Sequence, residues 1–129
     1  MNLKSIALCL MLGVSAPLLA GDLLPLQVAI AQTAPTADYA SDRWFVSIWF
    51  ADGSLQYEGI DRRNQARLRL AGATVSGDSS RRVYTWRNGD YRYQVSWRPS
   101  DPDFIRLQVF HPSGRELVNS LLQKVGPSL

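Results

Sequence analysis

Arginine is the residue type in this sequence whose number and spacing could support binding chemistry. The 129-residue chain has 14 basic residues and a formal net charge of +3, and only Lys4 and Lys124 are lysines. An arginine is always charged, and its planar fork of donors fits carboxylate and phosphate groups. Because side chains alternate between the two faces of a strand, we expect these arginines to lie together on the outward face of the sheet. Two aromatic residues near a hairpin tip are expected to form a ligand platform. The candidate ligand-binding residues are Arg87, Arg92, Arg98, Arg106, Trp86 and Tyr91.

An anionic envelope component or a protein partner is the expected partner of this arginine surface. The alternative is that the arginine stems cover the outside of a one-layer sheet while their charged ends stay in water. Nucleic acid is not expected, because the net charge is small and the aromatic residues fall mainly on the opposite, inward face. Those inward residues, Trp44 and Tyr57 among them, either fill the core or line a cup for a small apolar or sugar ligand.

Catalysis is not expected from the reactive side chains of this chain. His111 is the sole histidine, and it precedes Pro112 at an expected turn. The sole cysteine, Cys9, falls in a segment expected to be removed. The motifs of serine hydrolases, nucleotide-binding loops and dinucleotide-binding folds do not occur. We therefore predict a non-enzymatic protein with no catalytic residue, no metal site and no cofactor.

The stretch 83–97, VYTWRNGDYRYQVSW, is expected to organise the fold. At its centre is Asn88-Gly89, and both residues tolerate the positive φ of a two-residue type I′ hairpin turn. Such a turn would pair Trp86 with Tyr91. Because successive side chains of a strand point to opposite faces, most aromatic residues of the stretch would lie on one inward face.

Two further hairpins are predicted, one at Asp52-Gly53 and one at a five-residue turn over 99–103. Both place apolar residues opposite one another on the inward face. The predicted inward pairs are Phe50 with Leu55, Ile48 with Tyr57, Val46 with Gly59, Trp97 with Ile105 and Val95 with Leu107.

Phe45 and Trp49 fall on the outward face of the first of these hairpins. Side chains of this size are expected to be covered, by a C-terminal helix, by a closed barrel wall or by a partner. They are the candidate partner-binding residues.

The last segment, 114–125, changes its apolar period and is predicted to be a helix. Ser113 and Glu116 have the spacing of a capping box, and Gly126 would end the helix. A final strand is the alternative, because 112–114 also suits a turn. The apolar positions are Leu117, Val118, Leu121, Leu122 and Val125.

The N-terminal residues 1–31 are predicted to be a signal peptide. Lys4 precedes an uncharged apolar run, and Ala29 and Ala31 fit the peptidase subsites before Gln32. Residues 32–42 are small, polar and broken by a proline, so a flexible leader is expected. No transmembrane segment is expected after cleavage.

The expected fold class is mainly β (α+β): an antiparallel meander of about six short strands, barrel-like if the sheet curls, with one C-terminal helix. Residues 43–129 would form this single small domain. The expected function is that of an exported β-rich binding domain in the periplasm or at the cell envelope. The alternative is a structural or accessory subunit of a larger envelope complex. The sequence specifies neither the ligand nor the oligomeric state.

Overall fold

The structure, a computed structural model, describes residues 33–126, so the predicted signal peptide lies outside the described residues. The described residues from Ala34 onward form one compact unit. The described part contains nine antiparallel strands and no helix, which confirms the mainly β class but not the expected count of about six strands. No helix long and apolar enough to cross a membrane occurs in this part. The strands are β2 Asp38–Ala40, β3 Trp44–Ala51, β4 Ser54–Asp61, β5 Ala66–Ala71, β6 Thr74–Gly77, β7 Arg82–Asn88, β8 Tyr91–Arg98, β9 Asp101–Phe110 and β10 Glu116–Lys124.

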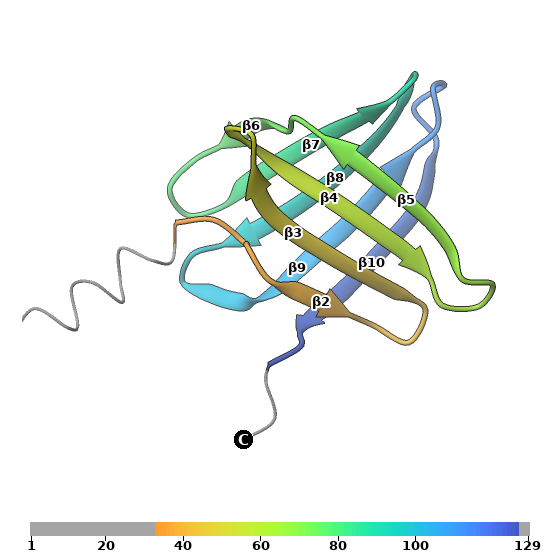
Figure 1. The fold of residues 1–129 in the computed structure, drawn as a ribbon. Coiled ribbons are helices and arrows are strands. Elements are labelled where there is room, and N and C mark those ends of the chain that lie inside the picture. The colour runs from red at the N-terminus through yellow and green to blue at the C-terminus, as the bar shows by residue number, and fades with distance from the viewer. Residues whose placement is uncertain (1–32, 127–129) are drawn as a thin grey trace, which may run out of the picture. The chain divides into compact units, whose positions relative to one another are not determined.

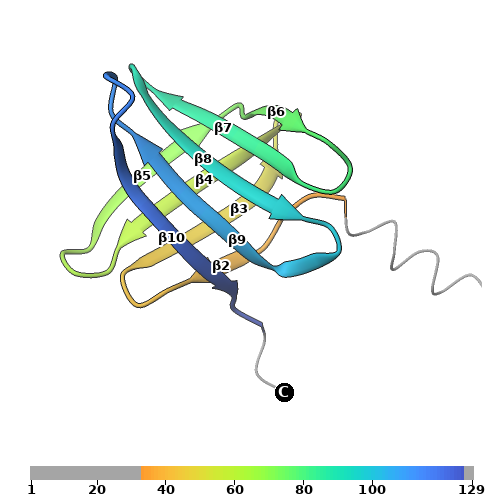
Figure 2. The same cartoon turned by 180° about the vertical axis from the view of Figure 1, so that it is seen from behind.

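The strands form a single sheet in the order β5-β4-β3-β2-β10-β9-β8-β7-β6. This order consists of two meanders, β2 to β5 and β6 to β10, and the strand pairing that joins them in the sheet is that of β2 with β10. The edge strands β5 and β6 are consecutive in the chain and are linked through Gly72, whose φ is +77°. The sheet therefore curls into a half-barrel in which the two meanders face each other (Figures 1 and 2).

The core fills the inside of this curl with large side chains from both meanders. Trp86 and Trp97 are 0% and 1% exposed. The indole N–H of Trp86 on β7 donates to the carbonyl of Leu55 on β4, at 3.0 Å, and so connects the two meanders across the interior. The other core residues are Tyr39, Val46, Ile48, Leu55, Tyr57, Leu70, Tyr84, Val95, Ile105, Leu107, Val109 and Leu122.

The β3–β4 and β8–β9 pairings confirm the register of every pair predicted for them. Phe50 pairs with Leu55 as predicted but is 62% exposed at the end of β3, so its expected place in the core is wrong. Asp52 and Gly53 have φ of 54° and 77°, as a type I′ turn requires. The expected five-residue turn over 99–103 is corrected. Arg98 pairs with Asp101, so the turn is shorter and the register shifts next to Trp97.

The turn between β7 and β8 lies one residue later than predicted. Asn88 pairs with Tyr91, and Trp86 pairs with Tyr93 instead of Tyr91. Gly89 occupies the first central position with φ of 61°, and Asp90 has no positive φ, which is typical of a type II′ turn. Moving the turn by one residue shifts each pair by two positions, so the predicted inward and outward faces are unchanged.

The predicted C-terminal helix is wrong, and the alternative of a final strand is confirmed. Gly114, with φ of +94°, lies in a turn closed by the His111 carbonyl, and β10 pairs along β9. Val118 packs against the core and Leu122 is 0% exposed. Leu121 lies on the opposite face and is 52% exposed. The helix-like spacing arose because a strand with apolar residues on both faces, and a bulge after Glu116, imitates a helical stripe.

Part of the expected flexible leader is the strand β2, so the ordered domain begins before Arg43. Tyr39 is 1% exposed, and Pro35 is also buried. β2 pairs with β3 on one side and with β10 on the other. The leader prediction is therefore corrected for residues 38–40, where a single buried tyrosine was too weak a strand signal.

Candidate ligand-binding site

A cavity of about 290 Å³ lies inside the half-barrel, between the two meanders. Both meanders contribute walls, from β3, β4 and β5 on one side and from β8, β9 and β10 on the other. We call it the interior cavity. Its lining residues are Trp44, Tyr57, Gly59, Asp61, Ala66, Arg67, Leu68, Tyr93, Leu107, Val109, Leu117 and Val118.

Tyr57 forms the centre of the aromatic wall. Its ring centroid is 5.2 Å from that of Trp86 and 5.9 Å from that of Tyr93, and both pairs are tilted. Tilted arrangements at these distances are favourable for aromatic rings. The ring packs over Gly59, two residues along the same strand face, and the Tyr57 hydroxyl occupies the space where a Cβ of residue 59 would lie. The absence of a side chain at Gly59 therefore allows this position of Tyr57.

The Tyr57 hydroxyl is a polar group beside the cavity. The residue is 2% exposed and borders the cavity, but its hydroxyl is not a fully buried atom without a partner; in residues 33–126 only Arg82 Nε is one. Burial is the main cause that raises the pKa of Tyr57 above its ordinary value, and Tyr93 adds to the shift. The phenol is therefore neutral and can both donate and accept a hydrogen bond. A hydroxyl that borders a cavity can bond to water or to a ligand that enters the cavity.

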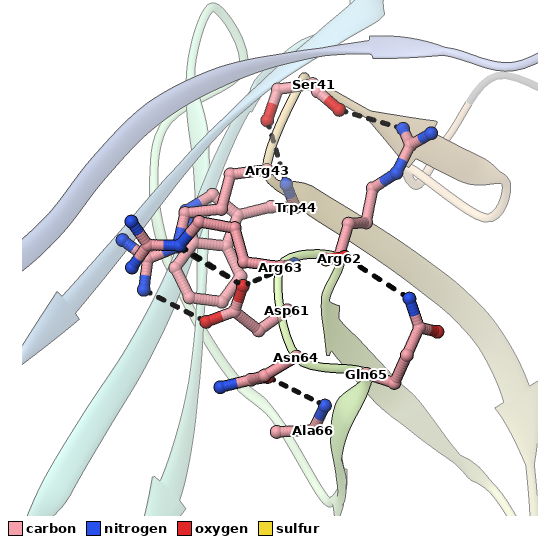
Figure 3. Close-up of polar contacts among 9 residues, drawn as sticks. All are labelled: Ser41, Arg43, Trp44, Asp61, Arg62, Arg63, Asn64, Gln65 and Ala66. Carbon is pink, nitrogen blue, oxygen red and sulfur yellow. Dashed lines mark hydrogen bonds and ion pairs between the residues drawn. The ribbon is translucent and has the colours of Figure 1, made fainter.

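The rim of the cavity is built by the β2–β3 and β4–β5 loops, which are tied together (Figure 3). The Arg43 guanidinium donates to both carboxylate oxygens of Asp61, at 3.3 Å and 2.9 Å, and lies 4.4 Å from the centre of the Trp44 ring. Arg62 Nη1 donates to the Ser41 carbonyl at 2.9 Å. Trp44, which forms part of the cavity wall, is thus held in place by interactions within the protein.

Asp61 is the carboxylate on which this rim depends. Its side chain is 12% exposed, and the hydrogen bond from Arg43 is the main cause that lowers the pKa of its carboxyl group. Asp61 also accepts the backbone N–H of Arg63 at 3.1 Å. The carboxylate therefore remains ionised at neutral pH and acts as a fixed structural anion.

A pH-dependent contribution to stability is expected from Asp61. A carboxyl whose pKa is lower in the folded state stabilises the fold above its unfolded pKa of about 4, and this contribution is lost as the pH falls through the folded value. Asp61→Asn should therefore lower the urea denaturation midpoint at pH 7, and the difference from wild type should shrink below about pH 4. Asp42→Asn, at an exposed carboxylate in the same loop, is the control. A difference that is equally large at acidic pH would contradict this role.

The charged groups near the cavity compensate one another. Arg67 borders the cavity and pairs with Glu58 at 3.3 Å, as Asp61 pairs with Arg43. The walls below the rim are aromatic and aliphatic. The cavity therefore offers a ligand an apolar surface with a few hydrogen-bonding groups, the usual composition of a small-molecule pocket.

The arginines predicted as ligand-binding residues lie on the outer face and fall into two groups. Arg87 and Arg92 are directly opposite each other near the β7–β8 turn, and Arg92 lies 4.5 Å from the centre of the Phe110 ring. Arg98 and Arg106 border a separate groove near the β8–β9 turn. The expected single arginine surface is thus divided along the length of the strands.

The two aromatic candidates of the β7–β8 hairpin also separate. Tyr91 is 37% exposed and packs edge-on against His111, with ring centroids 5.4 Å apart. Trp86 is fully buried, so its expected exposure near the hairpin tip is wrong. The one-residue shift of the turn places Trp86 deeper along the strand than the predicted pairing implied.

Phe45 and Trp49 lie on the outer face and are half-buried. The Arg69 guanidinium lies 5.2 Å from the centre of the Trp49 ring. Phe45 borders a shallow depression with Ile60 and Val125. No C-terminal helix covers them in the described part, and their role in binding a partner stays a prediction.

The sequence pointed to aromatic residues of the cavity but not to the elements that create it. Gly59 and the Arg43–Asp61 pair were not singled out. A usable signal was present, because a glycine two residues after a tyrosine on the same face of a strand leaves room for the ring. The Arg43–Asp61 bond depends on the arrangement of two loops and has no such local signal.

Comparisons with known proteins found no match. No protein-family model matches the chain, and no curated protein or solved structure is significantly similar to it.

Proposed function

We propose that this protein is an exported, non-enzymatic binding domain that holds a small, neutral, mainly apolar ligand in the interior cavity. The observation that carries the proposal is the cavity itself, whose aromatic and aliphatic walls come from both meanders and which Tyr57 borders. A ligand with one hydrogen-bonding group could bond to the Tyr57 hydroxyl while its apolar body filled the space.

The size of the cavity limits the ligand. An apolar cavity of about 150 Å³ accommodates benzene. The interior cavity, at about 290 Å³, is about twice as large and lies at the lower end of the range for ligand pockets. A ligand of one or two rings, or a single sugar ring, matches this volume.

The charge of the site favours a neutral ligand. The arginine and carboxylate side chains that border the cavity already pair with protein groups. A charged ligand would have to break these pairs or enter an apolar space without a counter-charge, which is costly. An anionic ligand is therefore disfavoured inside the half-barrel, in contrast to the outer face.

A binding role is favoured over catalysis by the pKa shifts of two side chains at the cavity, Asp61 and Tyr57. A general acid or base works best with a pKa near the working pH. The pKa of Asp61 is lowered and that of Tyr57 is raised, so both move away from neutrality. An extracellular or periplasmic location is supported by the signal-like N-terminal sequence, with Ala29 and Ala31 before Gln32.

Indole is a suitable probe because it is neutral, has two rings and carries one N–H. We expect it to bind wild-type protein and to perturb the amide resonances of residues that line the cavity. Tyr57→Phe should weaken indole binding about fivefold or more, since the N–H then lacks its partner. Indene has the same shape without the N–H, and its affinity should not fall in the variant.

Tyr84→Phe is the matched control, because Tyr84 is as buried as Tyr57 but does not border the cavity. It should bind indole as wild type does. The proposal fails if indole does not bind, or if the two phenylalanine variants weaken its binding equally.

A further inference from the structure

A second hollow lies on the outer face of the sheet, on the side away from the interior cavity. It is a groove of about 300 Å³ near the β8–β9 turn. Three arginines and one carboxylate, that of Asp101, border it together with a buried serine and four apolar side chains. The arginines, the serine and the two apolar residues used below are Arg81, Arg98, Arg106, Ser96, Phe104 and Leu121.

Positive charge is concentrated in the half of the domain that carries this groove. Residues 33–73 contain five arginines and five carboxylates, whereas residues 74–126 contain eight basic residues and five carboxylates. The ion pairs of the described part all lie in the first half, where they involve only Asp61 and Glu58. The arginines of the second half therefore form no ion pair among residues 33–126, although Arg81 lies near enough to Asp78 to help lower the pKa of that carboxyl.

Two of the three groove arginines donate hydrogen bonds to neutral groups and not to carboxylates. Arg81 Nη2 donates to the hydroxyl of Ser96 at 3.1 Å, and Ser96 is 8% exposed. Arg106 Nη1 donates to Asn119 Oδ1 at 2.7 Å. Each of these guanidinium groups keeps further N–H donors that a ligand can use. A bond to a neutral acceptor fixes the direction of a guanidinium and does not cancel its charge.

The apolar side of the groove indicates that the anion is attached to an apolar body. Leu121 is 52% exposed and pairs with Arg106 on the outer face, and Phe104 is half-buried beside them. Exposed apolar side chains next to unpaired cations favour an amphiphilic ligand over a simple inorganic ion.

We propose that this groove binds a phosphate monoester that carries an apolar group. The three guanidinium groups come from separate parts of the chain: the β6–β7 loop, the end of β8 and the middle of β9. A planar carboxylate has two oxygens and is best matched by a single arginine fork. A terminal phosphate offers three oxygens and up to two negative charges, which suits three separate donors. A lipid head group and a free phosphate ester share this chemistry.

Phenyl phosphate is the probe, and two charge-matched double variants test the site. Arg98→Gln with Arg106→Gln removes two groove arginines. Arg87→Gln with Arg92→Gln removes the same charge from the same face outside the groove. The groove variant should weaken binding at least about tenfold, because charge-assisted hydrogen bonds are lost, whereas the control should change it little. Amide resonances would show binding and confirm that both variants are folded.

Asp101 provides a test of opposite sign, because it is the carboxylate that borders the groove. Asp101→Asn should tighten phenyl phosphate binding several-fold by removing a repulsive charge. Benzoate should compete poorly. If the natural ligand is a lipid, vesicles that contain phosphatidic acid should retain wild-type protein and not the groove variant. If the vesicles retain neither protein, a soluble phosphate ester is indicated.

Three results would overturn this assignment: no binding of phenyl phosphate to wild type, equal weakening in both double variants, or benzoate binding as tight as phenyl phosphate. Equal weakening would mean that the general positive field, and not the groove, attracts the anion. The indole experiment concerns the other side of the sheet, so the two proposals fail independently.

Discussion

Replacement of Trp86 with alanine is expected to lower the free energy of unfolding by about 3–5 kcal/mol, the usual cost of removing a large buried aromatic side chain. Trp86 is fully buried, packs against Tyr57 and donates to the Leu55 carbonyl. These contacts run from one meander to the other, so their loss should also loosen the curl of the sheet. Urea denaturation followed by circular dichroism measures the change.

Trp86→Phe separates packing from hydrogen bonding. It retains an aromatic ring, and the Leu55 carbonyl keeps the N–H of Gly72 at 3.1 Å. The loss should therefore be clearly smaller than for alanine. Trp49→Ala, on the half-buried outer face, is the control for removing an indole and should also cost less than Trp86→Ala. Equal losses at positions 49 and 86 would contradict a special role of Trp86 in the core.

Gly59→Ala is expected to lower the free energy of unfolding by about 1–3 kcal/mol, the usual cost of overpacking. A Cβ at this position would collide with the Tyr57 hydroxyl and would lie 2.9 Å from Cζ of the same ring. The ring must then move into the interior cavity, so indole binding should be lost as well. Thermal unfolding and the amide resonance titration measure the two effects.

The double variant Gly59→Ala with Tyr57→Phe tests the cause of this loss. Removal of the hydroxyl takes away the closest clashing atom, so the two changes should not be additive, as expected for residues in contact. Ala66→Gly is the control, because it changes a small residue at the rim without adding a contact. Gly53→Ala is unsuitable, because Gly53 has a positive φ. Simple additivity would show that the ring does not pack over Gly59.

The hairpins were predictable because their information is local. Asp52-Gly53 supplies the two positive φ values of its turn, and the apolar pairs on either side agree with it. Asn88-Gly89 gave the correct faces but not the correct pairs. The residues on both sides of Gly89 allow either of two adjacent turns, and alternation along the strands is the same for both.

The strands β2 and β10 could not be predicted from local sequence as the hairpins could, because partners distant in the sequence determine them. β2 has three residues and its only strong apolar residue is Tyr39. The apolar spacing of β10 fits a helix. The exposure of Leu121 on the outer face, which distinguishes the strand from the helix, is known only from the structure. A short apolar segment cannot be assigned to helix or strand from its period alone.

The candidate site shows the same division between local and distant information. Aromatic residues on the inward face were predictable from alternation along β4 and β8. The cavity was not, since it arises where Tyr57 lies over Gly59 and two loops close through Arg43 and Asp61. Likewise Arg81 joins Arg98 and Arg106 only because the β6–β7 loop folds onto Ser96.

The pairing of β2 with β10 has a consequence for how the domain folds and how a ligand would affect it. Every other ladder joins neighbouring strands of the chain, whereas this one brings Tyr39 to Lys124 and closes the longest loop for only two residue pairs. Closing such a long loop costs conformational entropy before the contact contributes to stability. The two meanders should therefore form first and associate last. The interior cavity lies along that same junction, with walls from both meanders. A molecule bound in the cavity would therefore bind only the form in which the two meanders are associated, and it would slow their separation.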